Sequence, residues 1–262
     1  MEWRSEEILI IVKVYPVPSK KYGETVCTAG ITKSGAWIRL YPIPYRNLPP
    51  DKKFAKFQWI RARVAPASEK LQRPESHKID PDSIELLHTI PAQAGWSERE
   101  RYFLPLTSPS LELIMQEQEK YKTSLGAFRP KEVKNFVIEK ITDCWTPKQL
   151  GTLAQTSLLH TNKTTLEKIP YKFRYQFTCD NPHCTSHDMV ILDWEAVESY
   201  RNFKRIYKDE RTTLQKLKEK WLDYFFRERE SYFVVGTDSE FGKFMILTVV
   251  SPRRKTDQMS LL

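Results

Sequence analysis

The chain has 262 residues, with 42 lysines and arginines against 33 acidic residues, so its net charge is +9 at pH 7. A hydrophobic content of 40% and an aromatic content of 12% suit a folded protein with a sizeable core and exclude general disorder. No apolar run approaches the roughly 18 residues of a membrane span, and the start is acidic before it is apolar, so neither a membrane partner nor a secretory signal is expected. Four cysteines are too few for a disulfide scaffold, which favours a cytoplasmic location.

Positive charge is concentrated in two stretches of the sequence. Residues 1–65 contain twelve lysines and arginines against five acidic residues, and residues 131–178 contain eight against four. Both stretches are rich in predicted strands and aromatic side chains. A basic excess on strands beside aromatic residues is typical of a nucleic-acid surface, although a soluble protein can also be basic without such a partner.

The first quarter of the chain predicts four short strands with tight connections. Period-two patterns and β-branched residues place them at Glu7–Tyr15, Thr25–Thr32, Ala36–Ile43 and Lys52–Val64. On the third strand Trp37, Arg39 and Tyr41 share one face, and apolar residues occupy the other. Four such strands in about 65 residues predict a small barrel or half-barrel.

The run VCTAGITKSGAWIRLYPIPYR, from Val26 to Arg46, carries a resemblance to a known family. Its small-residue C-x-A-G strand, turn and WIR-type strand resemble the opening of prokaryotic proteins that contain a dual OB-fold domain. The resemblance implies two OB-like barrels in series and nucleic-acid binding, and it favours an accessory or subunit of a prokaryotic nucleic-acid-processing or antiviral defence system. It supplies no set of catalytic residues.

The rest of the chain alternates between strand and helix patterns. Strands are predicted at Asp80–Ile90, Val133–Trp145, Tyr171–Phe177, Met189–Leu192, Ser231–Gly236 and Lys243–Ser251, and helices at Ser110–Tyr121, from Thr146 to Leu158 and beyond Glu195. We therefore expect an α+β protein made of two small OB-like antiparallel β-barrels with helical insertions. The first would span residues 1–90, and the second, with a Cys/His turn, residues 91–262.

Metal-ligand residue types cluster at one place, between two predicted strands. Cys179, Cys184 and His187 have the spacing C-x4-C-x2-H, and thiolate and imidazole are ligands that zinc prefers in a closed tetrahedral site. Cys144 and His160 are the best candidates for a fourth ligand. The alternative is a tight turn with two buried thiols. The pattern predicts structural rather than catalytic zinc, because no histidine pair with a glutamate at helical spacing is present.

Our first hypothesis for function is a nucleic-acid-binding module without chemistry of its own and without sequence readout. OB-type barrels stack bases on surface aromatic rings while lysine and arginine follow the phosphates. The candidate binding residues are Lys20, Lys21, Trp37, Arg39, Tyr41, Tyr45, Arg46, Trp59, Arg61 and Arg63, with Lys52, Lys53 and Lys56 at the rim. Each tryptophan has a core position as its alternative, whereas Arg39, Arg61 and Arg63 are expected to reach water or a charged partner.

Two other functions remain open at the level of sequence. Asp188, Asp193 and Glu195 flank a short strand and could hold Mg²⁺ in a nuclease, but the lysine that such a pattern requires is replaced by Val197. The chain could instead be a protein-binding scaffold in a larger complex. No motif for a small-molecule substrate, nicotinamide or flavin is evident.

Overall fold

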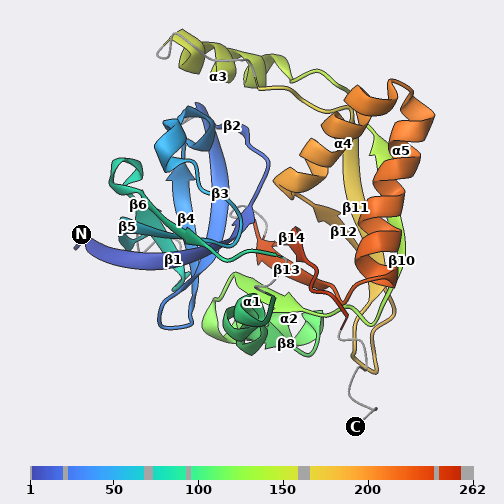
Figure 1. The fold of residues 1–262 in the computed structure, drawn as a ribbon, viewed down its shortest axis with the longest axis horizontal. Helices are drawn as coiled ribbons and strands as arrows, with labels where there is room; N and C mark the ends of the chain where they lie inside the picture. Colours follow the sequence, from blue (N-terminus) through green and yellow to red (C-terminus); the bar gives the residue numbers. More distant parts are fainter. Residues whose placement is uncertain are drawn as a thin grey trace.

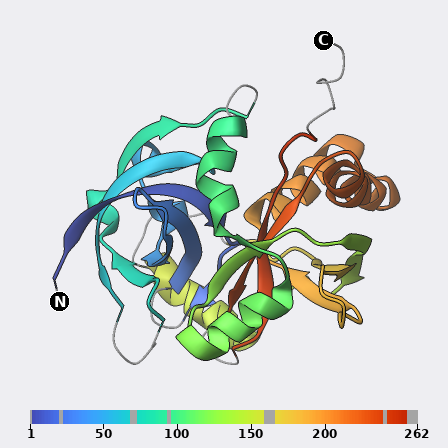
Figure 2. The ribbon, with the colours of Figure 1, turned by 90° about the horizontal axis from the view of Figure 1, so that it is seen from below.

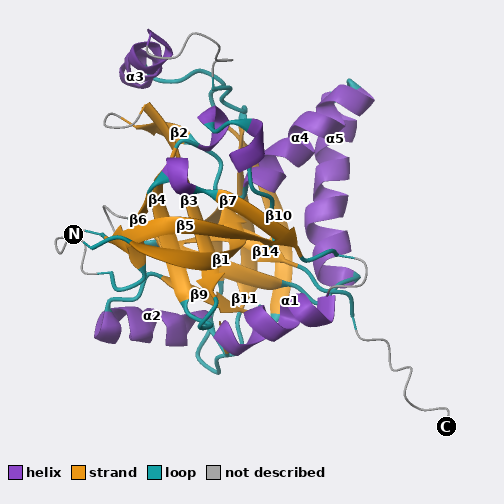
Figure 3. Ribbon diagram, turned by 60° about the vertical axis from the view of Figure 1, so that its left-hand side comes forward, coloured by secondary structure: helices purple, strands orange, loops and turns teal. Residues whose placement is uncertain are grey.

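Two β-sheets, one from each half of the chain, lie side by side, and the helices lie around them (Figure 1 and Figure 3). The structure is a computed structural model and describes residues 2–19, 23–67, 73–92, 96–158, 166–238 and 242–254. The view from below in Figure 2 separates the first sheet from the second sheet with its orange helices.

The first sheet closes into a barrel of five strands. Its strands are β1 (Arg4–Lys13), β3 (Gly23–Thr32), β4 (Trp37–Ile43), β5 (Gln58–Pro66) and β6 (Ser76–Ile79), with β2 (Val17–Ser19) and β7 (Glu85–Thr89) attached at the edges. The order is β1-β3-β4-β6-β5, and pairing of β5 with β1 completes the ring. All of these pairs are antiparallel except β4 with β6.

Alternation along β1 separates the inside of the barrel from its outside. Ile8 and Ile10 point into a cluster that fills the barrel, whereas Leu9 and Ile11 belong to a second cluster outside it. Gly30 on β3 is required by the close approach of β1, because an added Cβ atom would lie 2.6 Å from Cγ2 of Ile8. The barrel strands therefore bury side chains on both faces.

The second sheet follows a similar path. It consists of β8 (Thr107–Ser108), β9 (Leu125–Phe128), β10 (Glu132–Lys140), β11 (Tyr171–Thr178), β12 (His187–Ile191), β13 (Tyr232–Thr237) and β14 (Phe244–Val250). The order is β10-β11-β12-β14-β13-β9-β8, with β12 parallel to β14. Strand β10 forms one margin of the sheet, and β9 lies next to the other margin. Only residues 129–131 separate these two strands in the chain.

The helices pack against both sheets. They are α1 (Trp96–Phe103), α2 (Leu111–Tyr121), α3 (Pro147–Leu158), α4 (Trp194–Tyr207), α5 (Glu210–Lys218) and a π-helix (Glu219–Arg227), and 3-10 turns occur at Tyr45–Asn47, Pro50–Lys52, Pro81–Ser83 and Leu104–Leu106. Helices α2, α4, α5 and the π-helix pack against the second sheet, whereas α1 packs against barrel residues and α3 contacts β2 and β3 of the first sheet. Helix α4 is capped by Asp193 and α5 by Asp209. Among the described residues, none of the helices has the length and apolar character of a membrane-crossing segment.

The seam between the two sheets is an apolar core in its own right. Alternation on β13 and β14 directs Phe233 and Ile246 toward the helices, and Val234 and Leu247 toward the barrel. These two residues join the outward side chains of β1 and β3 in one continuous buried cluster. The part of the barrel's outer face that carries Leu9 and Ile11 is therefore covered by the second sheet, whereas Arg61 and Arg63 on β5 remain exposed.

Arg39 lies buried in this seam, 8% exposed. Its Nη1 donates to Oγ of Ser124 at 3.0 Å, and its Nη2 donates to the carbonyl oxygen of Thr237 at 3.0 Å. The Ser124 hydroxyl in turn donates to the buried carboxylate of Glu75, which also accepts from the Ser124 amide at 2.6 Å. One arginine thus fixes a strand of the barrel to two segments of the second half, and the expectation that it reaches water or binds a charged partner directly is wrong.

Most predicted elements are confirmed, but strand directions and several bounds are corrected. The strand predicted at Lys52–Val64 begins only at Gln58, and the strand predicted at Val133–Trp145 ends at Lys140. Helices α2 and α3 occupy the predicted ranges, and β11 alternates buried and more exposed residues as expected. The sheets are not purely antiparallel, because each contains a parallel pair formed by a crossover. The strand predicted from Asp80 is shorter, because the Asp80 side chain accepts from the amide of Asp82 and starts a 3-10 turn instead.

We expect Arg39→Met to lower the free energy of unfolding by about 2–4 kcal/mol, because it leaves buried acceptors without their donor. Arg63→Met is the control, since Arg63 is bonded to Asp80 on the exposed side of the barrel and an exposed pair contributes at most about 1 kcal/mol. Denaturant unfolding of both variants measures the difference. Equal losses of unfolding free energy in the two variants would contradict a stabilising role of Arg39 in the seam.

Candidate metal centre and nucleic-acid interface

Four side chains from three elements converge in a metal-ligating cluster. Cys179 follows β11, Cys184 lies in the turn, His187 begins β12, and Glu112 comes from the first turn of α2. One ligand atom from each lies within 4.8 Å of all the others. Three of the four ligands are those that the spacing predicted.

The local fold explains how the cluster forms. The amide of Cys184 donates to the carbonyl oxygen of Asn181 at 3.0 Å, and the amide of Cys179 donates to Sγ of Cys184 at 3.3 Å, so the turn folds both sulfurs inward. Ser110 caps α2 and fixes its first turn. The position of α2 is set by Ile114, which fills the space above Gly126, where a Cβ atom would lie 2.8 Å from Ile114.

The distances suit one small cation. Nε2 of His187 lies 3.3 Å from each sulfur and 3.0 Å from Oε1 of Glu112, and Sγ of Cys179 lies 2.6 Å from Oε2 of Glu112. A tetrahedral ion with bonds of about 2.0–2.3 Å separates its ligand atoms by roughly 3.3–3.8 Å, so a small expansion admits it. The cluster could therefore hold a metal ion.

Protons compete with a metal for this cluster. Burial, with hydrogen bonds to Glu112 and Cys184, raises the pKa of the Cys179 thiol to about 12. Burial alone would raise the pKa of Glu112, but hydrogen bonds from Cys179, its own amide and Ser110 hold it below the usual value. Metal binding must displace the thiol proton, so metal affinity should rise with pH.

Cys144 is not the fourth ligand. It is exposed, and its thiol donates to Asp143 at 3.2 Å in the loop before α3. His160 lies outside the described residues. Sequence reasoning missed Glu112, which lies 67 residues before Cys179 and carries no local signal other than its place after the Ser110 cap.

The exposed arginines of the barrel are paired with acidic residues. Arg61 binds Glu7 at 2.7 Å and Glu85 at 3.1 Å, and Arg63 binds Asp80. Arg46 binds Glu24 at 2.7 Å. These partners offset much of the positive charge that the sequence assigned to the barrel surface.

The aromatic candidates on the barrel are mostly packed against protein. Trp59 is 2% exposed, and Trp37 lies partly buried against Phe103 in the seam. Tyr45 contacts Phe54 and Trp194 edge to face, whereas Tyr41 is exposed. Lys20 and Lys21 lie outside the described residues. The structure therefore does not bring the predicted binding residues together on one open face.

A different surface gathers basic side chains. We call it the basic hollow: a depression of about 480 Å³ beside the junction of β9 and β10 and the end of the π-helix. Its cations are Arg129, Lys131, Lys134, Arg227, Arg229 and Arg254, and Glu132 is its one carboxylate. In the described part of the chain, Lys131, Lys134 and Arg254 form no ion pair.

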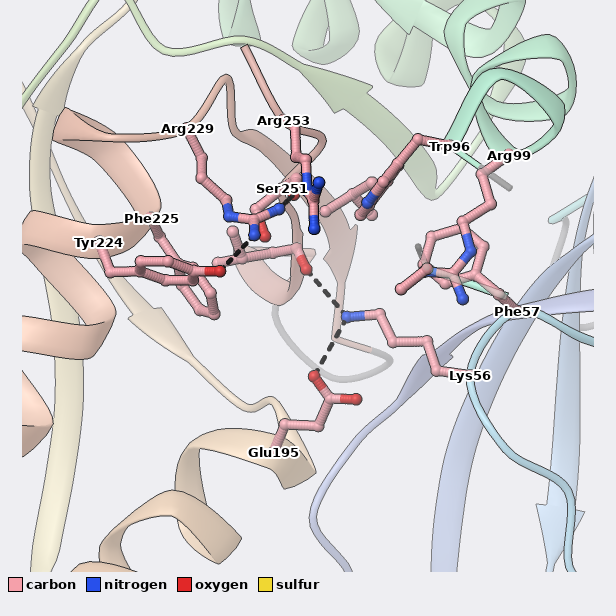
Figure 4. A pocket seen from close by; sticks show the side chains of 13 residues that line it. Lys56, Phe57, Trp96, Arg99, Glu195, Tyr224, Phe225, Arg229, Ser251 and Arg253 are labelled. Carbon is pink, nitrogen blue, oxygen red and sulfur yellow. Dashed lines mark hydrogen bonds and ion pairs between the residues drawn. The ribbon is translucent and has the colours of Figure 1, made fainter. Parts of the chain in front are cut away.

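A second depression adjoins the basic hollow through Arg229. We call it the seam cavity, a space of about 350 Å³ lined from both halves of the chain (Figure 4). Lys56 donates to Oγ1 of Thr248 at 2.7 Å and lies 3.5 Å from Glu195. Lys56 holds the pKa of Glu195 below its usual value, so this glutamate is a carboxylate at neutral pH.

The carboxylates proposed for a nuclease have other partners. Asp193 is buried, caps α4 and accepts from Thr248, and burial raises its pKa to about 6 against the opposing effect of Lys56. Asp188 binds Arg174 at 3.0 Å. Among the described residues, Asp188, Asp193 and Glu195 do not form a metal-ligating group, and the geometry gives no support to a nuclease.

The fold and site define a protein of two adjoining sheets with a Cys/His/Glu cluster, a basic hollow and an apolar seam. Residues 107–262, more than half of the chain, match the family described as a domain of unknown function, DUF8757, and the chain belongs to this family. Residues 4–105 match a second domain of unknown function, DUF8758. No curated protein matches the chain. The two matches meet at residue 106, after α1.

We expect purified wild-type chain to contain about one metal ion, and Cys179→Ser to lose it, because a hydroxyl is a poor substitute for thiolate. Glu112→Gln should reduce occupancy, and the control Cys144→Ser should leave it unchanged. Plasma mass spectrometry of extensively dialysed protein measures the content. Loss of the metal from Cys144→Ser, together with full metal content in Glu112→Gln, would contradict the ligand set.

Proposed function

We propose that this chain binds DNA or RNA through its phosphate backbone, along the basic hollow and the adjoining seam cavity. The observation that carries the proposal is that both depressions share Arg229. Together they are lined by nine cationic side chains and two carboxylates. A concave surface of one charge sign concentrates its field, and a polyanion is the partner that matches it.

Part of the charge on this surface is unpaired, although Arg129 and Arg227 in the basic hollow bind Glu230 and Asp223. In the described residues, Lys131, Lys134, Arg253 and Arg254 have no acidic partner, whereas Arg61 and Arg63 each bind at least one carboxylate. A cation already held by a carboxylate gains less from a phosphate, because the existing pair must first be broken. Phosphates should therefore follow the hollow rather than the barrel.

Strand order supports an OB-like fold for both halves. Strands β1, β3, β4, β5 and β6, numbered 1 to 5, run 1-2-3-5-4 and close on strand 1. With β10 to β14 numbered in the same way, the second sheet runs 1-2-3-5-4, and strand 4 pairs with β9, directly before strand 1. Strands 3 and 5 are parallel in both. A five-stranded Greek-key barrel of this kind commonly binds oligonucleotides.

The seam explains why the ligand surface would differ from the usual one. OB barrels commonly bind ligands on the face of strands 2 and 3. In the first barrel strand 3 carries Trp37, which packs against Phe103, and Arg39, which is bonded to Ser124 and Thr237 of the second half. The proposed basic surface lies instead on the second half, in the basic hollow, and reaches the junction of the two halves only at the seam cavity.

We propose zinc as the ion of the cluster. Two sulfurs, one imidazole and one carboxylate form a closed set of four, which suits structural zinc and leaves no ligand position for catalysis. The ion would fix α2 to the turn between β11 and β12. This role is independent of the nucleic-acid surface.

A titration tests the binding proposal. Fluorescence anisotropy with labelled single-stranded DNA, single-stranded RNA and duplex should give binding that weakens steeply with salt. Lys131→Gln with Lys134→Gln should weaken binding about tenfold and reduce the salt slope by about two, since each lysine contributes one phosphate contact.

The matched control removes the same number of positive charges, but from the barrel surface. Arg61→Gln with Arg63→Gln should alter affinity less than about twofold at moderate salt, because exposed and paired side chains contribute little. Equal losses in both double variants would indicate diffuse charge and overturn the assigned surface. Absence of binding by wild type to any nucleic acid at low salt would overturn the function.

A further inference from the structure

The seam cavity differs from the basic hollow in having aromatic walls. Phe57 and Trp96 contact edge to face at 5.8 Å on the side of the first half, and Tyr224 and Phe225 lie 5.6 Å apart on the opposite side. Figure 4 shows these pairs facing each other across the space. Phosphate contacts alone would not require such walls.

Each aromatic wall carries an arginine on a ring face. The guanidinium of Arg99 lies 4.0 Å from the ring centre of Phe57 and 5.0 Å from that of Trp96. The guanidinium of Arg229 lies 4.6 Å from the ring centre of Tyr224. Aromatic rings and guanidinium groups are the surfaces on which unpaired bases stack in single-strand binding proteins. In this cavity Trp96 and Tyr224 are the more exposed rings, whereas Phe57 and Arg99 are buried.

The polar groups of the cavity are also fixed in place. Lys56 is held by Thr248 and by the carbonyl oxygen of Val249 at 2.8 Å, and Arg99 donates from Nε to the carbonyl oxygen of Ile90 at 2.9 Å. Arg229 donates to the carbonyl oxygen of Ser251 at 3.2 Å. Glu195 leaves a carboxylate at the edge, able to accept from the amino or imino groups of a base. The cavity therefore offers stacking, a base-edge acceptor and cations for the adjoining phosphate.

We propose that the seam cavity takes one unpaired base of a nucleic-acid strand, while the flanking phosphates follow the basic hollow. This inference rests on the proposed function and deepens it, because it selects single strands, or strands with an unstacked base, over continuous duplex. A volume of about 350 Å³ lies at the lower end of ordinary ligand pockets and suits a single nucleotide, whereas a base pair in a duplex stays stacked and outside. The ligand chemistry is a heterocyclic base with an adjoining phosphate.

The first test changes the ligand rather than the protein. A single strand whose bases are replaced by abasic sites keeps its phosphates but cannot stack, so wild type should bind it about tenfold more weakly than the normal strand. Wild type should also bind single strand at least tenfold more tightly than duplex of equal length. Equal affinity for normal and abasic strands would overturn the base pocket.

The second test changes the walls. Trp96→Leu with Tyr224→Leu should weaken binding of the normal single strand about tenfold, with the salt slope unchanged, and should abolish the preference over the abasic strand. Tyr121→Leu is the control, since Tyr121 is an exposed aromatic on α2. Retained preference in the folded double variant would overturn the assignment.

A competition experiment distinguishes a free nucleotide from a nucleic-acid strand as the ligand. A nucleoside monophosphate should displace the labelled strand only at concentrations at least a hundredfold higher than unlabelled strand, because it lacks the flanking phosphates. A monophosphate that binds as tightly as the strand would overturn the strand as the ligand. If the proposed nucleic-acid binding itself is wrong, the result differs, because wild type would then bind no strand at low salt.

Discussion

The burial of one side of the barrel's outer face against the second sheet determines most of the other features of this structure. Leu9 and Ile11 meet Val234 and Leu247 in one apolar cluster, and the buried Arg39 and Glu75 are both bonded to Ser124. Because an unpaired buried donor or acceptor costs about 1–3 kcal/mol, this network fixes the orientation of the two halves. The seam cavity is lined from both halves, so its shape depends on that orientation.

Local patterns in the sequence predicted the elements well. The stripe of Leu111, Ile114 and Met115 predicted α2, and alternating aromatics predicted β11. The spacing of Cys179, Cys184 and His187 predicted three ligands that the structure places together. These features depend on contacts within a few residues, which periodicity and turn chemistry report directly.

Features that depend on distant contacts could not be predicted in this way. Arg39 and Trp59 stand at positions where the strand alternation predicts exposed side chains. In the structure the second sheet covers Arg39, and neighbouring aromatic residues cover Trp59. Glu112 reaches the metal cluster only because α2 packs over Gly126. The basic hollow combines residues near 130, 227 and 254, which no local pattern connects.

Hydrogen–deuterium exchange of the full chain, with and without a saturating single-stranded oligonucleotide, tests the central claim most directly, because it reports every segment of the surface at once. We predict slower exchange in residues 129–134, 224–231 and 251–254 and at α1, with unchanged exchange on strand β5, which carries Arg61 and Arg63. Protection confined to β5, with none in the four segments named, would contradict the account.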